Sequence, residues 1–146
     1  MRNMLLITKE YKFCAAHKYW NSCWDEQRNI DVFGDDVKNH GHNYILRVTV
    51  CGTTDEQSGF LLDLQWLNKI VSRKLIKVLD HSQIDEDIPW FENRQPSTEN
   101  LVVFIWDTLC PYFKDTNSSL FKIYLRETPT IFTEYYGPNA NKREVT

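Results

Sequence analysis

Three of the four histidines in this 146-residue chain have a spacing that could gather them around one metal ion. His40 and His42 flank a glycine in the segment KNHGHNY, directly before a run of residues typical of a β-strand. Residues i and i+2 of a strand point to the same face, about 6.6 Å apart along the chain. The two imidazoles can therefore converge on one ion, although the same spacing also suits histidines that are only hydrogen-bonded.

His17 is the candidate for a third imidazole. It follows a predicted strand over residues 4–16 and continues the face of its alternate residues, which are Ile7, Lys9, Tyr11, Phe13 and Ala15. If this strand pairs with the strand after His42, the three histidines meet. Three neutral histidines with one open position form a typical catalytic zinc site. The spacing alone leaves a metal site and a set of structural histidines as alternatives.

Two further places carry groups that can move protons or bind a ring. Asp80 and His81 follow a predicted helix, and a carboxylate beside an imidazole can orient it and raise its pKa, which makes a proton shuttle. Glu127 ends a predicted strand, where a carboxylate can bind a guanidine-like edge through two parallel hydrogen bonds. The structural alternatives are a histidine at a helix end and a surface glutamate at a hairpin.

The first half of the chain is predicted to contain two strands and a long loop. The segment 18–41 lacks periodicity, and loops of this length in compact domains are often functional. The segment NYILRVTVCG is rich in β-branched residues and predicts the second strand. The segment TTDEQSG has the composition of a turn.

The second half predicts two helices and two strands. FLLDLQWLNKIVSRKLIKVLD has an amphipathic pattern after its first residues, and PSTENLVVFIWDTL begins with Ser97 as N-cap and Glu99 in the first turn. The strands LFKIYLRE and TIFTEYYG follow. This order predicts an α+β fold in which helices cover one face of an antiparallel sheet, and its open edges favour oligomerisation. The predicted core positions of the first helix are Leu64, Leu67, Val71, Leu75 and Val78.

The bulk properties predict one domain over residues 1–146, with a polar tail at 138–146 that we expect to fray. The net charge of −3, from 17 basic and 20 acidic residues, argues against a nucleic-acid partner. No apolar run is long enough to cross a membrane, and the charged start does not resemble a signal peptide, so we expect a cytoplasmic protein. The four cysteines form no CxxC pair, and we expect reduced, mostly buried thiols.

Six segments together resemble the 6-pyruvoyl-tetrahydropterin synthase family, which includes the 6-carboxytetrahydropterin synthases. They are FCAAHKYW, FGDDVKNHGHNY, GFLLDL, LDHSQID, PSTENLVVFIW and RETPT, and the resemblance covers residues 5–137. It implies an α+β domain of the tunnelling-fold type, with a four-stranded antiparallel sheet and two helices on one face. It also implies an oligomeric barrel, namely a homohexamer built as a dimer of trimers with active sites between subunits.

The resemblance further implies a zinc-dependent lyase whose small-molecule substrate is the pterin 7,8-dihydroneopterin triphosphate. Elimination of triphosphate leads to the pyruvoyl product of tetrahydrobiopterin biosynthesis. Cleavage of the side chain leads to the carboxy product of queuosine biosynthesis. The implied residues are a Zn²⁺ site of His17, His40 and His42, a proton relay of Asp80 and His81, and a pterin pocket of Glu127, Ser97 and Thr98.

The chain departs from the family pattern at the base, which is usually a cysteine in the loop before the HGH motif. Asp36 stands at that position. Three interpretations stay open: Asp36 replaces the thiolate, as a glutamate does in members that release 6-hydroxymethyl-dihydropterin; Cys23 supplies the thiol; or the chain binds pterin without turnover. A solvated carboxylate is the weaker base, because its reference pKa is about 3.9 against about 8.5 for cysteine.

Overall fold

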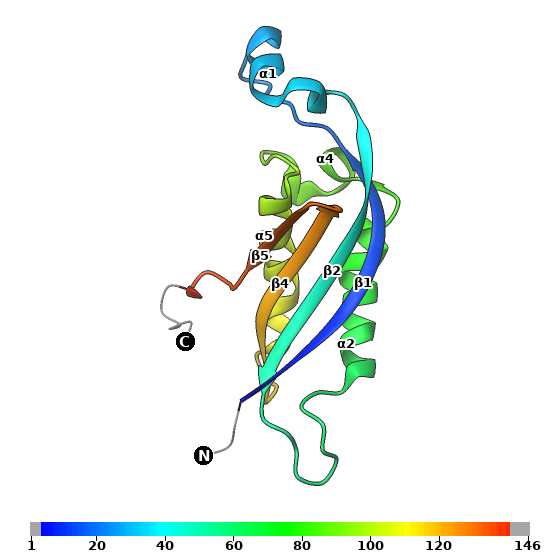
Figure 1. Cartoon of the computed structure of the whole chain (residues 1–146), viewed down its shortest axis with the longest axis vertical. Helices are drawn as coiled ribbons and strands as arrows, with labels where there is room; N and C mark the ends of the chain where they lie inside the picture. Colours follow the sequence, from blue (N-terminus) through cyan, green and yellow to red (C-terminus); the bar gives the residue numbers. More distant parts are fainter. Residues whose placement is uncertain (1–3, 141–146) are drawn as a thin grey trace.

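The computed structural model describes residues 4–140, which fold around one twisted sheet (Figure 1). The strands lie in the order β3-β1-β2-β4-β5. β3 runs parallel to β1, and the other neighbouring strands pair antiparallel. The predicted four-stranded antiparallel sheet is therefore present, but the two-residue β3 makes the whole sheet mixed and five-stranded. The strands are β1 (Leu5–His17), β2 (His40–Gly52), β3 (Ser82–Gln83), β4 (Ser119–Thr128) and β5 (Ile131–Tyr135).

Two helical rods cover the same face of this sheet (Figure 1). The first consists of α2 (Leu64–Val71), the π-helical turn η2 (Ser72–Ile76) and α3 (Lys77–Leu79), and the second of α5 (Thr98–Leu109) and the 3₁₀ turn η4 (Cys110–Phe113). The short elements α4 (Ile84–Asp87) and η3 (Pro89–Phe91) connect them. The predicted order of elements and the one-sided helical layer are confirmed. The core between the layers includes Phe13, Leu46, Val48, Leu75, Leu79, Leu101, Ile105, Ile123 and Leu125.

The predicted core face of the first rod is correct in its middle and wrong at its ends. Leu67, Val71 and Leu75 are buried, whereas Leu64 and Val78 are 38% and 42% exposed. A π-helical turn has more residues per turn than an α-helix, so it shifts the face of every later residue. Because η2 precedes α3, the core position after Leu75 falls on Leu79.

The segment 18–41, predicted to be a loop, contains α1 (Glu26–Phe33) and the 3₁₀ turn η1 (Gly34–Val37). Asp25 caps α1 by accepting a hydrogen bond from the backbone N–H of Arg28 at 2.8 Å. The helix left no apolar periodicity in the sequence because Ile30 and Val32 are exposed rather than packed in a core. Buried Asn29 anchors it instead, through hydrogen bonds with the backbone N–H and carbonyl of Asn21.

The β1–β2 register positions the histidines. Ala15 pairs with His42 and His17 pairs with His40, so the ladder ends at the two outermost histidines. β2 begins at His40, and both histidines of the HGH motif therefore belong to the strand rather than preceding it. The core residue Phe13 pairs with Tyr44 across the ladder. Because alternate residues of a strand share a face, His17 lies on the same side of the sheet as Phe13, and His40 and His42 lie on the same side as Tyr44. All three histidines therefore point to the helical side of the sheet.

Three further expectations concern the cysteines, the membrane and the tail. All four cysteines are free, but only Cys51 is buried, because Cys14 faces away from the core, Cys23 lies in a turn and Cys110 ends a helix. Among residues 4–140, none of the helices has the length and apolarity that a membrane crossing requires. Most of the tail expected to fray, residues 141–146, lies outside the described part of the chain.

Candidate metal centre

The three histidines of β1 and β2 converge at the end of the ladder. The Nε2 atoms of His17 and His42 are 3.1 Å apart. The ring of His40 lies 4.6 Å from that of His17 and 5.0 Å from that of His42, measured between centroids. One nitrogen from each ring can be chosen so that all three lie within 4.8 Å of one another. The structure thus brings the three predicted metal ligands together.

Backbone carbonyls orient two of these rings. His17 Nδ1 lies 2.7 Å from the carbonyl oxygen of Pro96, and His40 Nδ1 lies 2.8 Å from that of Lys38. A carbonyl oxygen only accepts, so each Nδ1 carries the hydrogen and donates it. This leaves the Nε2 lone pair of both rings free, which is the arrangement common among metal-binding histidines.

The protonation of these histidines also favours metal binding. Burial lowers the pKa of His17 to about 4, although the Pro96 hydrogen bond opposes the change. Burial and the neighbouring His40 lower the pKa of His42 in the same direction. Both rings are therefore neutral near pH 7, and the neutral imidazole is the form that coordinates a metal.

The donor set and its spacing fit zinc. Zn²⁺ is bound by imidazole nitrogen at about 2.0–2.1 Å in tetrahedral sites, which separates two ligand nitrogens by about 3.3 Å. The Nε2 atoms of His17 and His42 are already at 3.1 Å. Three imidazole ligands also leave a position for a substrate or water, as in catalytic sites.

Two carboxylates flank the histidines. Glu127 Oε1 lies 3.4 Å from the Nε2 atoms of both His17 and His42, and its side chain is only 12% exposed. Burial raises the pKa of Glu127, and the carboxylates of Asp36 and Glu99 add to this effect, whereas His40 opposes it. Asp36 Oδ1 lies 3.8 Å from His40 Nε2, with 59% of its side chain exposed. The centre thus combines one buried and one exposed carboxylate.

Sequence comparison assigns the chain to a family. Residues 6–138 match the family model described as 6-pyruvoyl tetrahydropterin synthase. The chain belongs to the 6-pyruvoyl tetrahydropterin synthase family. The cluster of His17, His40 and His42 is consistent with the zinc site of this family.

Individual members show how far the similarity extends. A 6-pyruvoyl tetrahydrobiopterin synthase of Drosophila melanogaster is 33% identical over 134 residues, which covers 90% of this chain and 79% of the relative. A 6-carboxy-5,6,7,8-tetrahydropterin synthase of Bacillus subtilis is 30% identical over 100 residues, or 66% of each chain. The solved 6-pyruvoyl tetrahydropterin synthase of Caenorhabditis elegans superimposes with a TM-score of 0.86 at 27% identity and covers 94% of this chain and 99% of its own.

Asp80 and His81 form a pair beside β1, and no hydrogen bond or ion pair joins either residue to the three histidines within residues 4–140. Asp80 Oδ1 accepts the backbone N–H of Cys14 at 2.8 Å, and Asp80 Oδ2 lies 3.0 Å from His81 Nδ1. The Cys14 hydrogen bond, followed by His81, holds the pKa of Asp80 below its usual range. His81 is 83% exposed, yet it lines the same open hollow of about 380 Å³ as His42 and Cys14.

Ser97 and Thr98 lie beside the centre at the start of α5. Ser97 Oγ accepts the backbone N–H of Asn100, which confirms it as the N-cap. Thr98 is buried, and its hydroxyl lies 3.0 Å from that of Thr133 on β5. The carbonyl of the preceding residue, Pro96, orients His17. No hydrogen bond joins either residue to Glu127 within residues 4–140.

The centre also contains two tyrosines that were not predicted from the sequence. Tyr44 packs its ring 5.7 Å from that of His42, and its buried hydroxyl has no hydrogen-bond partner among the described residues. Tyr19 packs against His17 at 5.1 Å, and its backbone N–H binds the carbonyl of Asp36 at 2.9 Å. Burial raises the pKa of both hydroxyls, so both remain protonated donors. The i+2 spacing after His42 was a usable signal for Tyr44, whereas Tyr19 left none.

Cys23, the alternative base, lies apart from the histidines. It is exposed, and its backbone N–H binds the side chain of Asn21 at 2.9 Å. It lines a separate hollow together with Trp20 and Arg94. The Oδ1 atom of Asp36, in contrast, lies 3.8 Å from His40 Nε2. Of the two candidate bases, Asp36 is therefore the one that lies beside the histidines.

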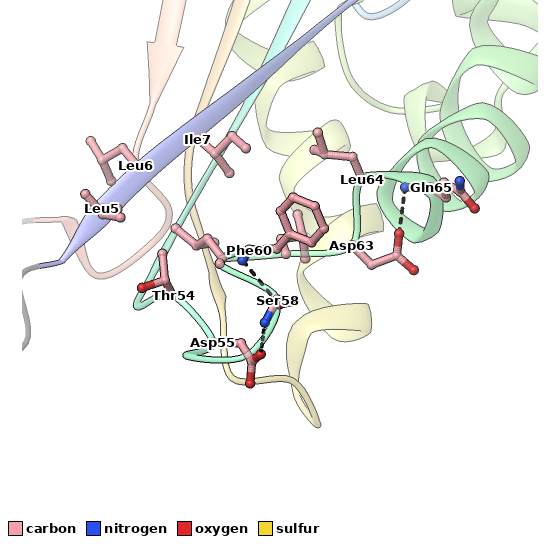
Figure 2. Close-up of a pocket in the computed structure, with 13 residues that line it drawn as sticks. Leu5, Leu6, Ile7, Thr54, Asp55, Ser58, Phe60, Asp63, Leu64 and Gln65 are labelled. Carbon is pink, nitrogen blue, oxygen red and sulfur yellow. Dashed lines mark hydrogen bonds between the residues drawn. The ribbon is translucent and has the colours of Figure 1, made fainter.

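A larger pocket lies at the other end of the β1–β2 ladder and contains no predicted site residue (Figure 2). Its volume is about 830 Å³, and its apolar lining includes Leu5, Leu6 and Phe60. The loop before α2 forms one wall, where Asp55 accepts the backbone N–H of Ser58 at 2.7 Å. This hydrogen bond confirms the turn predicted for TTDEQSG.

Proposed function

We propose that the chain is a zinc-dependent lyase of the 6-pyruvoyl tetrahydropterin synthase type that acts on 7,8-dihydroneopterin triphosphate. The observation that carries the proposal is the convergence of His17, His40 and His42, whose ligand nitrogens lie within 4.8 Å of one another. Family membership supports the substrate class. When bound there, Zn²⁺ would polarise a side-chain oxygen of the substrate and so acidify the neighbouring C–H bond.

Glu127 is the proposed anchor of the pterin ring. A carboxylate can accept two parallel N–H groups from the ring, and such charge-assisted bonds are strong and directional. Because Glu127 Oε1 lies 3.4 Å from the Nε2 atoms of His17 and His42, a ring bound to it would lie next to the metal centre. Ser97 and Thr98 are proposed to line the same pocket from the start of α5.

Proton transfer is assigned to the carboxylate and imidazole groups around the histidines. Asp36, beside His40, is proposed to take the proton from the acidified C–H bond of the substrate. Asp80 orients His81, and this pair is proposed to relay a proton between the side chain and the ring of the substrate. Loss of triphosphate from the deprotonated side chain then yields the pyruvoyl product.

The exposure of Asp36 supports two alternative functions. A carboxylate in contact with water is a weak base, and 59% of this side chain is exposed. The first alternative is a lyase with another product, either 6-carboxytetrahydropterin or 6-hydroxymethyl-dihydropterin. The second is a pterin-binding protein without turnover.

The proposal includes a homohexamer, built as a dimer of trimers whose sheets join into a barrel. Exposed apolar side chains on the strands near both edges of the sheet support it. They are Leu5 and Leu6 on β1 and Ile131 and Phe132 on β5, each 47–57% exposed. Open strand edges with apolar residues favour pairing with another chain. Such an assembly would cover the edges and bring groups from neighbouring chains to each metal centre.

The deciding experiment is incubation of the zinc-loaded protein with 7,8-dihydroneopterin triphosphate, with the products identified by mass. The pyruvoyl, carboxy and hydroxymethyl products differ in mass, so one measurement separates the three lyases. Tight pterin binding without any product would favour the binding protein. Absence of both product and pterin binding would contradict the proposed function.

A further inference from the structure

Gln83 connects two segments of the chain that flank the metal centre. Its side-chain nitrogen carries two hydrogens. It donates to Asn39 Oδ1 at 2.6 Å and to Asp85 Oδ1 at 2.7 Å. Asp85 Oδ1 also accepts the backbone N–H of Lys18 at 3.2 Å. One amide group therefore links the side chain of Asn39 to the backbone at Lys18.

These two residues lie immediately beyond the ladder that carries the histidines. His17 and His40 form its last pair, so Lys18 and Asn39 have no ladder partner of their own. The ends of strands open most easily because no further hydrogen bond holds them. The bridge through Gln83 supplies a connection at the place where the next pair of the ladder would be.

The backbone of Gln83 is itself well anchored. Gln83 pairs with Ala16 in the parallel β1–β3 ladder. Its backbone N–H donates to Asp87 Oδ2 at 2.8 Å, within the short helix α4. A fixed backbone lets the side chain hold the segment of Asn39 against β1 instead of moving with it.

His40 depends on this bridge more than His17 does. The ring of His17 is oriented by the carbonyl of Pro96, which belongs to a different part of the fold. The ring of His40 is oriented by the carbonyl of Lys38, in the same short segment as Asn39. Displacement of that segment would therefore move both the backbone of His40 and the group that orients its ring.

We propose that Gln83 is a positioning residue for the metal centre, which holds the segment before His40 so that all three histidines can bind one ion. The inference rests on the proposed zinc site, and Gln83 touches neither metal nor substrate. Removal of a group that orients a metal ligand typically lowers metal affinity by about 10–100-fold.

The test compares full-length wild-type protein, Gln83→Ala and the matched control Gln27→Ala. Gln27 makes a similar hydrogen bond, to Asp31 at 2.8 Å within α1, but connects no segment that carries a metal ligand. Affinities for Zn²⁺ and Co²⁺ are measured by competition with a chelator, and the visible spectrum of bound Co²⁺ reports its coordination. We expect Gln83→Ala to weaken both affinities about tenfold or more and to alter the spectrum, with Gln27→Ala equal to wild type.

An exchange of groups provides a rescue. Gln83→Glu removes both donated hydrogens and introduces a carboxylate next to that of Asp85, so affinity should fall at least as far as in Gln83→Ala. Adding Asp85→Asn restores the link to Lys18, because the new amide can donate to the introduced carboxylate while its oxygen accepts the N–H of Lys18. The Asn39 amide can turn so that its nitrogen donates to the same carboxylate, which restores the other link. The double variant should recover metal affinity and the wild-type Co²⁺ spectrum.

Four outcomes are separable. Weakened affinity with an altered spectrum in Gln83→Ala, reversed in the double variant, supports the inference. Equal affinities and spectra for Gln83→Ala and wild type overturn it. A lower melting temperature of the metal-free protein with an unchanged Co²⁺ spectrum also overturns it, because it indicates a role in folding only. Wild-type protein that binds neither ion through its histidines contradicts the proposed zinc site itself, and the inference falls with it.

Discussion

The Nε2 atoms of His17 and His42 face each other at 3.1 Å across the β1–β2 ladder. His17 pairs with His40 and His42 pairs with Ala15, so this contact runs diagonally between neighbouring pairs. Since His17 Nδ1 donates to the carbonyl of Pro96, the neutral His17 ring presents a lone pair at Nε2. In its Nε2–H tautomer, His42 can donate to this lone pair, and a bound cation would take the place of that hydrogen.

The first prediction concerns the metal. His42→Ala should strongly reduce zinc content, because it removes one of three ligands that approach one point. His81→Ala is the matched control, since His81 is 83% exposed and should leave zinc at the wild-type level. Metal analysis after purification in zinc-containing buffer provides the measurement. Full zinc occupancy in His42→Ala would show that the three histidines are not the site.

The second prediction concerns Glu127. Glu127→Gln should weaken pterin binding about tenfold or more, since leaving donors of the bound ring unpaired costs about 1–3 kcal/mol. Zinc affinity should stay near the wild-type value. Glu134→Gln, on the neighbouring strand, is the control and should change neither affinity. Calorimetric titration with a dihydropterin measures the effect; unchanged pterin affinity would refute the anchor, and loss of zinc would instead identify Glu127 as a metal ligand.

The third prediction concerns the base. Asp36→Asn should retain zinc and pterin binding but lose turnover by about 10²–10⁴-fold, the usual cost of losing a general base. Asp36→Cys should keep or raise activity, because it restores the thiol that the family usually has at this position. Asp35→Asn is a control in the same turn, with a side chain that is 99% exposed.

Cys23→Ala decides between the two candidate bases in the same assay. It should be nearly silent, because Cys23 is exposed and lines a different hollow from the histidines. If Cys23→Ala abolishes turnover while Asp36→Asn does not, the assignment of Asp36 is wrong.

The fourth prediction concerns assembly. Light scattering at micromolar concentration should give the mass of a homohexamer. Phe132→Lys should shift the mass to smaller species, because it places a charge on the exposed apolar side of β5. Val32→Lys is the control, since Val32 is 56% exposed but belongs to α1 rather than to the sheet. A monomeric wild-type protein would rule out the proposed barrel.

The fifth prediction concerns acid stability. The Cys14 hydrogen bond, followed by His81, lowers the pKa of Asp80 in the folded state, so ionised Asp80 stabilises the fold above its unfolded pKa of about 3.9. This contribution is lost as the pH falls through the lower folded-state pKa. Wild type should therefore exceed Asp80→Asn in stability at pH 5, and the difference should shrink toward pH 2. Urea midpoints at several pH values measure it, and a constant difference would exclude this role.

Local patterns in the sequence were sufficient for the four long strands, for the two longest helical segments and for part of the site, but not for α1. Period-two alternation identified the face of β1 that ends at His17, and the i+2 spacing of His40 and His42 identified their common side. Ser97 was correctly predicted as the N-cap of α5. These features depend on residues a few positions apart, and the family motifs that they belong to were recognisable for the same reason.

Other features depend on segments that are distant in the chain, and only the tertiary structure decided them. The π-helical turn moved a core position from Val78 to Leu79, and the parallel strand β3 forms because Ser82 and Gln83 meet Ala15 and Ala16. The contact of Glu127 with two histidines has the same origin, since side chains from β1, β2 and the end of β4 must first pack together. No pattern within one segment records these contacts, because their free energy comes from burial and hydrogen bonds between segments.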